Sequence, residues 1–186
     1  MTDDELRLLG NVSGKRVLEL GCSDAAAAIT LAGQGAHVIA VADRTDSVER
    51  ARQAIDRSEA KVELHHSDLA DLAFIRADTV DAAYSIDSLR HVEDLDRVFR
   101  QVHRVLRNDA PLLVSFPHPT LDLIDTSADP ALLIRRSYFD RSDNRRTVAD
   151  LFTSFGRAHF AVDTLLEPES GSMPRTLVLR GRKLGN

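Results

Sequence analysis

The chain has 186 residues, the size of a single domain, and 43% of them are hydrophobic, enough to build a core. It carries 24 Lys and Arg against 29 Asp and Glu, so the net charge is −5 at pH 7. This acidic balance argues against a broad nucleic-acid-binding surface and against an anionic membrane surface. Cys22 is the only cysteine, which excludes an internal disulfide and fits a reducing, cytoplasmic location. The acidic start predicts no signal peptide, and no apolar run approaches the roughly 18 residues of a membrane span.

A short apolar strand, a turn of small residues and a helix follow one another near the start of the chain. Residues 16–20 read Arg-Val-Leu-Glu-Leu, residues 21–25 read Gly-Cys-Ser-Asp-Ala, and an alanine-rich segment predicts a helix over 24–33. Small residues in the turn let a ligand approach the backbone, and the start of the helix offers unpaired N–H groups. In an open α/β sheet, this first strand-to-helix turn is the usual place of a nucleotide-like cofactor.

Predicted strands and helices alternate along the rest of the chain, which is typical of a parallel, doubly wound sheet. The other predicted strands are 37–42, 61–65, 80–85, 111–116, 160–166 and 175–182. The other predicted helices are 3–10, 46–57, 93–107 and 147–157. The last two strands form an antiparallel hairpin at one end of the sheet. The predicted fold class is therefore α/β, with a seven-stranded, mostly parallel sheet and a C-terminal antiparallel hairpin.

Two prolines, Pro117 and Pro119, end the regular pattern. We expect an irregular insert or lid over residues 117–146, within a single domain that spans residues 1–186. This segment contains five arginines in an otherwise acidic protein, and it is either a solvated loop or a lid that pairs with an anionic substrate. The arginines are Arg135, Arg136, Arg141, Arg145 and Arg146.

Two side chains on predicted helices have expected local roles. Asp46, with Glu49 three residues later, predicts a capping box at the start of its helix. His103 falls on the charged face of the helix over 93–107, so we expect it to be solvated.

Motifs along nearly the whole chain resemble those of the class I S-adenosylmethionine-dependent methyltransferases. VLELGCSDA, from Val17, resembles the first motif of that family, an acidic residue followed by a glycine-rich loop. VIAVADRT, from Val38, resembles the second, an acidic residue at the end of strand two. HSDL, from His66, resembles the third, an aspartate after strand three. The segments from Val80 and from Leu95 resemble the strand-four motif and the helix before strand five, and the C-terminal hairpin resembles small-molecule members.

The resemblance implies S-adenosylmethionine as the cofactor and assigns roles to the first two motifs. The turn would lie under the methionine part of the cofactor, and Glu19 would face its amino group or the turn amides. Asp43 would accept hydrogen bonds from both ribose hydroxyls, because the two oxygens of a carboxylate can accept two donors. The cofactor-binding candidates in these motifs are Glu19, Gly21, Cys22, Ser23, Asp43 and Arg44.

The third and fourth motifs supply four more candidates by the same resemblance. Asp68 would accept a hydrogen bond from the adenine amino group, and the Leu69 N–H would reach a ring nitrogen. Ser85 and Ile86, at the end of strand four, would flank the methionine part near the transferred methyl group.

The sequence departs from the family pattern at the turn. Ser23 and Ala25 stand where the family usually has glycines, and a Cβ there narrows the approach and disfavours a positive φ. The register at strand two is also open. Counting back from the following helix puts Ala42 at the acidic position, whereas matching Asp-x-Thr puts Asp43 there.

His91 and His118 are the candidate catalytic residues, because each follows a strand at the ligand edge and could accept a proton from the acceptor. Packing of a partly buried histidine is the alternative for both. His65 and His66 point to opposite faces of their strand and make no recognised ligand spacing with Asp68, so no metal is predicted.

The predicted function is transfer of a methyl group from S-adenosylmethionine to a small-molecule acceptor, which the sequence does not identify. A catalytically inactive, methyltransferase-like binding domain is the alternative, prompted by the missing glycines and the short N-terminal segment. A nicotinamide-dependent oxidoreductase is a weaker reading, because the turn is not G-x-G-x-x-G. We expect no nucleic acid and no membrane as partners. The sequence leaves the oligomeric state open, and a homodimer in which the second chain covers the pocket is one alternative.

Overall fold

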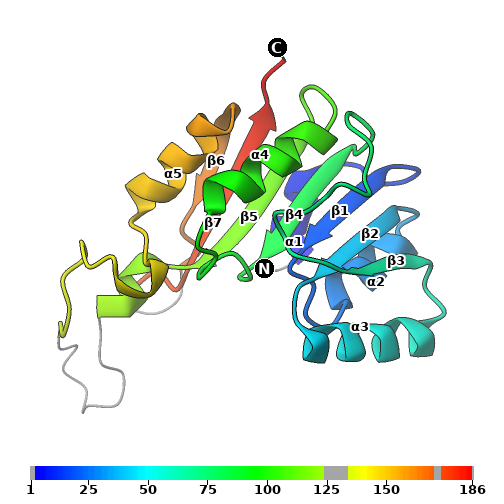
Figure 1. Cartoon of the computed structure of the whole chain (residues 1–186), viewed down its shortest axis with the longest axis horizontal. Helices are drawn as coiled ribbons and strands as arrows, with labels where there is room; N and C mark the ends of the chain where they lie inside the picture. The colour runs from blue at the N-terminus through cyan, green and yellow to red at the C-terminus, as the bar shows by residue number, and fades with distance from the viewer. Residues whose placement is uncertain (1–2, 124–133, 170–172, 186) are drawn as a thin grey trace.

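One seven-stranded sheet, with strand order β3-β2-β1-β4-β5-β7-β6, runs through the molecule (Figure 1). The computed structural model describes residues 3–123, 134–169 and 173–185. The strands are β1 (Arg16–Leu20), β2 (His37–Ala42), β3 (Val62–His66), β4 (Ala82–Ile86), β5 (Pro111–Pro117), β6 (Phe160–Leu166) and β7 (Thr176–Lys183). The helices are α1 (Asp3–Leu6), η1 (Arg7–Leu9), α2 (Ala26–Gly33), α3 (Thr45–Ser58), α4 (Leu95–Val105), η2 (Pro119–Leu123), η3 (Ser142–Asn144) and α5 (Val148–Arg157).

The pairing of the strands confirms the predicted fold class. β3, β2, β1, β4 and β5 are mutually parallel, whereas β7 pairs antiparallel with both β5 and β6. β4 is shorter than predicted, because Val80 makes only an isolated bridge to Leu106 outside the strand. The chain steps outward from β1 to β2 and β3, and then returns to place β4 on the other side of β1. The sheet therefore changes its direction of winding between β1 and β4.

Helices cover both faces of the sheet, and each face has its own apolar core (Figure 1). α4 and α5 pack on the face that buries Leu18 and Leu20 of β1. α1, α2 and α3 pack on the face that buries Val17 and its cross-strand neighbours. Because side chains alternate along a strand, Glu19 shares the face of Val17. A carboxylate is thus built into the side of the sheet that α2 covers.

The periodic helix of the sequence is confirmed as α4. Five of its apolar side chains are buried: Leu95, Val98, Phe99, Val102 and Val105. Asp94 caps its N-terminus, accepting a hydrogen bond from the Arg97 N–H at 2.8 Å.

The capping box predicted at Asp46 is wrong. α3 begins one residue earlier, at Thr45, so Arg44 is the N-cap and makes no side-chain cap. Asp46 lies in the first turn, where a carboxylate interacts favourably with the helix N-terminus, and it pairs with Arg44 and Arg50.

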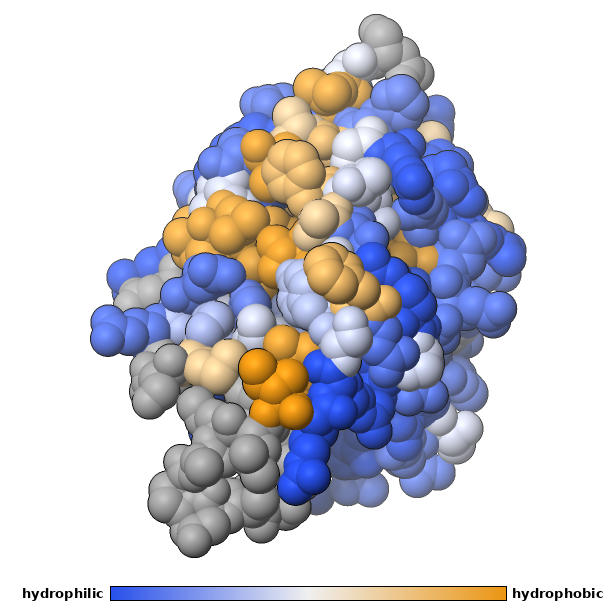
Figure 2. All heavy atoms as spheres, turned by 90° about the vertical axis from the view of Figure 1, so that its left-hand side faces the viewer, coloured by the Kyte–Doolittle hydropathy of each residue, from blue (hydrophilic) through white to orange (hydrophobic). Residues whose placement is uncertain are grey.

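The β6 end of the sheet has apolar side chains on its outside. β6 has a neighbour on one side only, and Leu165 and Leu166 of β6 are exposed, as is Phe152 of α5. Figure 2, which faces this end, shows apolar side chains gathered among charged ones.

None of the helices in the described ranges has the length and apolar character needed to cross a bilayer.

His103 is not solvated, contrary to the expectation from its helix face. Its ring lies 5.4 Å from that of Phe160 and 6.1 Å from that of His159, and Nε2 is buried with no partner among the described residues. Burial and the nearby Lys183 ammonium both lower the pKa of His103. Tertiary packing of β6 and β7 against α4 covers a face that is polar in sequence.

Replacing His103 with Gln should flatten the dependence of stability on pH below neutrality. Because the pKa of His103 is lower in the folded state, its contribution is complete above the unfolded pKa of about 6.5 and is lost as pH falls below it. Urea unfolding at pH 7.5 and 5.5 checks this, with the exposed His37→Gln as a control for loss of a histidine. Equal losses in wild type and His103→Gln would contradict the prediction.

Candidate functional site

The carboxyl ends of β1 and β4 lie side by side at the point where the winding of the sheet reverses. Leu20, the last residue of β1, pairs with Ser85 of β4. In open α/β sheets, ligands bind in the crevice outside such a switch point. The turn that the sequence singles out, residues 21–25, crosses this crevice.

The first turn residue, Gly21, is locked to two neighbouring segments. Its N–H and that of Cys22 both donate to the Val41 carbonyl of β2 at 2.9 Å. Ser88, in the loop after β4, donates from Oγ to the Gly21 carbonyl at 2.6 Å. Gly21 has φ of 73°, and a Cβ there would lie 2.2 Å from Cβ of Ser88. Only glycine fits, and Ser88 is a site residue that sequence reasoning missed, because nothing local marks its contact with Gly21.

The non-glycine residues of the turn leave its front open. Ala25 adopts the left-handed φ of 60°, which costs about 1 kcal/mol relative to glycine, and its methyl group is fully buried behind the turn. In front lies a cavity of about 310 Å³, here called the β1 hollow. Its lining includes Glu19, Gly21, Ser23, Asp24, Thr30 and Ile86. The backbone at Ala25 therefore adopts the left-handed conformation that a glycine would take. The side chains of Ser23 and Ala25 do not fill the hollow.

Glu19 is the electrostatic centre of the β1 hollow. It is 5% exposed, and Oε2 is buried without a partner among the described residues. Burial raises the pKa of Glu19 to about 7, and the Asp24 charge adds to this rise, while Cys22 and Tyr84 beside the carboxyl group oppose it. A buried carboxylate without a counter-charge is costly, so a positively charged ligand group is the partner that this geometry lacks.

Cys22 and Ser85 lie inside the protein rather than in the hollow. The Cys22 thiol is buried, and burial together with Glu19 raises its pKa, so it stays a protonated packing residue. The Ser85 hydroxyl is fully buried and has no partner among the described residues. Ile86, the next residue, does line the hollow.

Backbone hydrogen bonds bring the loops after β1, β2 and β3 to one edge. The Val41 carbonyl accepts from Gly21 and Cys22, and the next carbonyl, that of Ala42, accepts from the Ser67 N–H at 3.1 Å. Asp43 and Asp68, which follow these contacts, are both exposed. The three candidate neighbourhoods therefore lie at the same edge of the sheet, although Asp43 and Asp68 are not part of the lining of the β1 hollow.

At strand two, the structure separates the two residues between which the register is open. The Ala42 side chain is fully buried in the core, whereas Asp43 is exposed directly after the strand. Arg44 is turned toward α3, where Nε lies 3.1 Å from Asp46.

At strand three, Asp68 Oδ1 accepts from the Ala70 N–H at 2.7 Å, and the Leu69 side chain is buried. This bond holds the turn after β3 in place. His65 lies 2.7 Å from Glu63 and stacks on Phe74.

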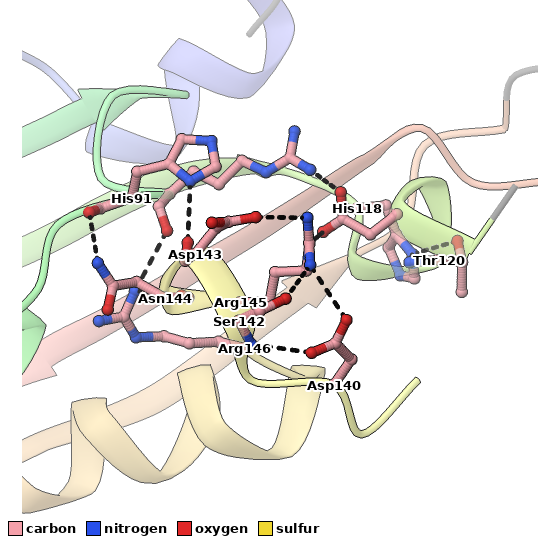
Figure 3. Close-up of polar contacts among 11 residues, drawn as sticks. His91, His118, Thr120, Asp140, Ser142, Asp143, Asn144, Arg145 and Arg146 are labelled. Atoms are coloured by element: carbon pink, nitrogen blue, oxygen red, sulfur yellow. Dashed lines mark hydrogen bonds and ion pairs between the residues drawn. The ribbon is translucent and has the colours of Figure 1, made fainter. Parts of the chain in front are cut away.

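The two candidate histidines lie in different settings (Figure 3). His91 is exposed, with Nδ1 3.2 Å from the Asp143 carbonyl oxygen. His118 is 3% exposed, with Nε2 2.8 Å from Glu167 and Nδ1 2.7 Å from Thr120 Oγ1. Both ring nitrogens of His118 are therefore engaged inside the chain, where they tie the end of β5 to the end of β6.

Three arginines and one aspartate link the insert to the loop after β4, in a group we call the arginine clamp: Arg90, Asp122, Arg145 and Arg146. Figure 3 labels Arg145 and Arg146. Asp122 pairs with Arg90 and lies 3.9 Å from Arg145. Arg146 donates to the carbonyl oxygens of Arg90, Val92, Glu93 and Asn144. These guanidinium groups are committed to partners in the chain, which disfavours the idea that they wait for an anionic substrate. Residues 124–133 of the insert lie outside the described residues.

A family model described as a methyltransferase domain matches residues 18–114, just over half of the chain. The chain belongs to this family, the class I S-adenosylmethionine-dependent methyltransferases. It is 29% identical over 132 residues to a demethylmenaquinone methyltransferase of Clavibacter sepedonicus, covering 71% of this chain and 49% of that protein. The chain thus spans about half the length of this curated relative.

Solved structures of methyltransferases share the fold. An S-adenosylmethionine-dependent methyltransferase from Mesorhizobium loti superposes with a TM-score of 0.81 at 24% identity, covering 97% of this chain and 96% of that one. A geranyl diphosphate C-methyltransferase from Streptomyces coelicolor, solved with S-adenosyl-L-homocysteine, gives 0.76 at 10% identity, covering 98% and 78%. S-adenosylmethionine is thus the cofactor of the family whose fold this chain has.

Gly21→Ala should destabilise the fold by about 2–4 kcal/mol, because the new Cβ meets Ser88 and φ is positive. Gly156→Ala, within α5 and with open space around it, is the matched control and should change stability by no more than about 1 kcal/mol. Urea unfolding of both variants measures the difference. Similar free energies of unfolding for the two variants would contradict the prediction, because they would show that Ser88 can move away from the new Cβ at little cost.

Glu19→Gln should stabilise the protein at pH 8 and have little effect at pH 5. The pKa of Glu19 is about 7 in the folded state, above the unfolded value of 4.5. Ionisation of Glu19 therefore lowers the free energy of unfolding as pH rises from 4.5 to 7, and the loss amounts to about 3 kcal/mol above pH 7. We expect the free energy of unfolding of Glu19→Gln to rise by about 1–3 kcal/mol at pH 8, because burying the polar amide offsets part of the stabilisation. Urea unfolding at both pH values, with the exposed Glu49→Gln as control, tests this, and an equal effect at pH 5 and 8 would contradict it.

Proposed function

We propose that this protein transfers a methyl group from S-adenosylmethionine to a small-molecule acceptor. The observation that carries the proposal is the buried Glu19 carboxylate, whose Oε2 has no partner among the described residues, in an open hollow at the sheet switch point, on the same edge as Asp43 and Asp68. A ligand with a cation at one end and hydrogen-bond donors along its length matches this arrangement.

Each residue has a stated task toward the cofactor. Glu19 accepts from the methionine ammonium, while the Gly21 turn lets the ligand lie against the backbone. Asp43 accepts from the two ribose hydroxyls, since it is the first exposed side chain beyond β2. Asp68 accepts from the adenine amino group through the oxygen that Ala70 does not occupy. Arg44, Ser23, Leu69 and Ile86 border this path, and Ser85 supports it from inside.

When bound, the cofactor supplies an activated methyl on a sulfonium, which has a good leaving group already attached. The residues of the chain then have to align an acceptor atom with that methyl and exclude water. The loop after β4 lies next to Ile86, and its position is fixed by Ser88 and the arginine clamp.

A proton released by the acceptor would pass to His91 rather than to His118. His91 is exposed on the loop after β4, whereas both nitrogens of His118 are already hydrogen bonded. His118 serves in this proposal as a structural support for the acceptor side.

A small molecule is the acceptor class that the chain favours. The chain is acidic, with a net charge of −5, and the arginines of the clamp are paired internally. A polyanionic nucleic acid would find little attraction in such a surface. The curated relative named above is, by its name, a methyltransferase of demethylmenaquinone, a small molecule, which supports the same class.

A non-catalytic binding domain is the second candidate, and the residues Ser23 and Ala25 at family glycine positions are the observation behind it. It predicts cofactor binding without methyl transfer. Turnover with any acceptor in a broad panel of phenols, amines, thiols and carboxylates, followed as release of S-adenosylhomocysteine, would exclude it.

Isothermal titration with S-adenosylhomocysteine tests the cofactor proposal. We expect wild type to bind and Asp43→Asn to bind about 10-fold or more weakly, since a charged acceptor is lost. Asp56→Asn, an exposed carboxylate on α3, is the matched control and should bind as wild type does. Absence of binding to wild type at millimolar ligand would overturn the proposal.

A further inference from the structure

The β1 hollow has an unusual charge content for a site that would receive an amino acid. Of the described residues that line it, only Glu19 and Asp24 carry a charge, and both are acids. The methionine part of S-adenosylmethionine carries an ammonium and a carboxylate together. Within the described lining, the ammonium meets two opposite charges and the carboxylate meets no cation.

The N-terminus of α2 would be the natural substitute for a cation, because its free N–H groups attract anions. Here Asp24 already occupies that position, since its Oδ1 accepts from the Ala26 N–H at 3.1 Å. The first N–H of the helix is therefore already bound by a carboxylate of the chain itself. A ligand carboxylate placed there would face Asp24 as a like charge.

Glu19 supplies an independent sign that the hollow is built for a cation. It is only 5% exposed, it lines the hollow, and Oε2 has no partner among the described residues. The groups packed around it are the Cys22 thiol and the Tyr84 hydroxyl, with Asp24 as the nearest charge that acts on it. None of these groups, taken from the described residues, is positive, so a cation on the ligand would supply the counter-charge that Glu19 lacks among them.

Arg7 is the cation to be considered, because it lines a neighbouring cavity of about 290 Å³ that shares Leu6 and Thr30 with the β1 hollow. It belongs to the lining of that neighbour and not to the lining of the hollow itself. A role for Arg7 in holding the ligand carboxylate is the rival arrangement, and a variant can test it directly.

We infer that the β1 hollow recognises its ligand through the ammonium alone and gives the neighbouring carboxylate no counter-charge. The inference rests on the proposed function for the identity of the ligand, and it specifies which end of that ligand carries the affinity. Its consequence is that the decarboxylated form of the cofactor fits as well as the intact one. Glu19 and Asp24 are the specificity-determining residues, and Glu19 is the one that contacts the ammonium.

The test compares four adenosyl thioethers by isothermal titration at pH 8. These are S-adenosylhomocysteine, its analogue without the carboxylate, its analogue without the amino group, and methylthioadenosine, which lacks both. For wild type, loss of the amino group should weaken binding by about 10- to 100-fold, as for loss of a charge-assisted hydrogen bond. Loss of the carboxylate should change Kd by less than about 3-fold or tighten binding. A larger cost for the carboxylate than for the amino group would overturn the inference.

Variants assign the effect to residues. In Glu19→Gln, the difference between the ligands with and without an amino group should shrink to less than about 3-fold. In Asp24→Asn, ligands that carry the carboxylate should gain relative to those that lack it, which keeps the test independent of the behaviour of Glu19→Gln. Arg7→Gln should leave the carboxylate effect unchanged, and loss of a carboxylate preference in that variant would establish the rival arrangement.

The controls separate failure of this inference from failure of the proposed function. Asp43→Asn should weaken all four ligands by a similar factor, because it acts on the ribose that they share. If wild type binds none of the four, the proposed function is overturned. If wild type binds S-adenosylhomocysteine but depends on its carboxylate, the proposed function stands and this inference is wrong.

Discussion

The contact between Gly21 and Ser88 is the constraint on which the site depends. It joins the turn after β1 to the loop after β4 across the switch point, with a 2.6 Å hydrogen bond and no room for a Cβ. The same turn is tied to β2 through the Val41 carbonyl. A shift of either loop would open or close the β1 hollow, and the chain fixes the two loops with backbone bonds to Val41, the Ser88 hydroxyl and the Arg146 guanidinium.

Glu19 shows the energetic cost of a buried carboxylate in the candidate site. A carboxylate that is almost fully buried, with one oxygen unpartnered, destabilises the folded state when it ionises near neutral pH. An apolar residue would pack there without this cost. The retained charge is understandable if a ligand cation supplies the missing interaction, because binding then recovers the energy that folding lost.

The described parts of the insert, residues 117–123 and 134–146, illustrate how basic residues can be structural in an acidic protein. Arg146 donates hydrogen bonds to four carbonyl oxygens, and Asp122 forms ion pairs with Arg90 and Arg145. A planar guanidinium suits this task, because its several donors can serve several acceptors at once. The arginine clamp holds the loop that carries His91. The arginines therefore fix the position of that loop and do not offer a free charge to a ligand.

The sequence by itself determined the order of elements, the strands of the sheet and the carboxylates at its edge. Buried strands read as apolar runs and α4 as a periodic pattern, because local spacing reflects the face that is buried. The sheet order, the contact of Ser88 with Gly21, the burial of His103 and the pairing of the arginines were decided only by tertiary structure. Each of these joins residues far apart in the chain, and Ala25 in a left-handed conformation shows that packing also overrides a local preference. Local sequence carries information about which face of an element is buried, but not about which distant side chain will lie against it.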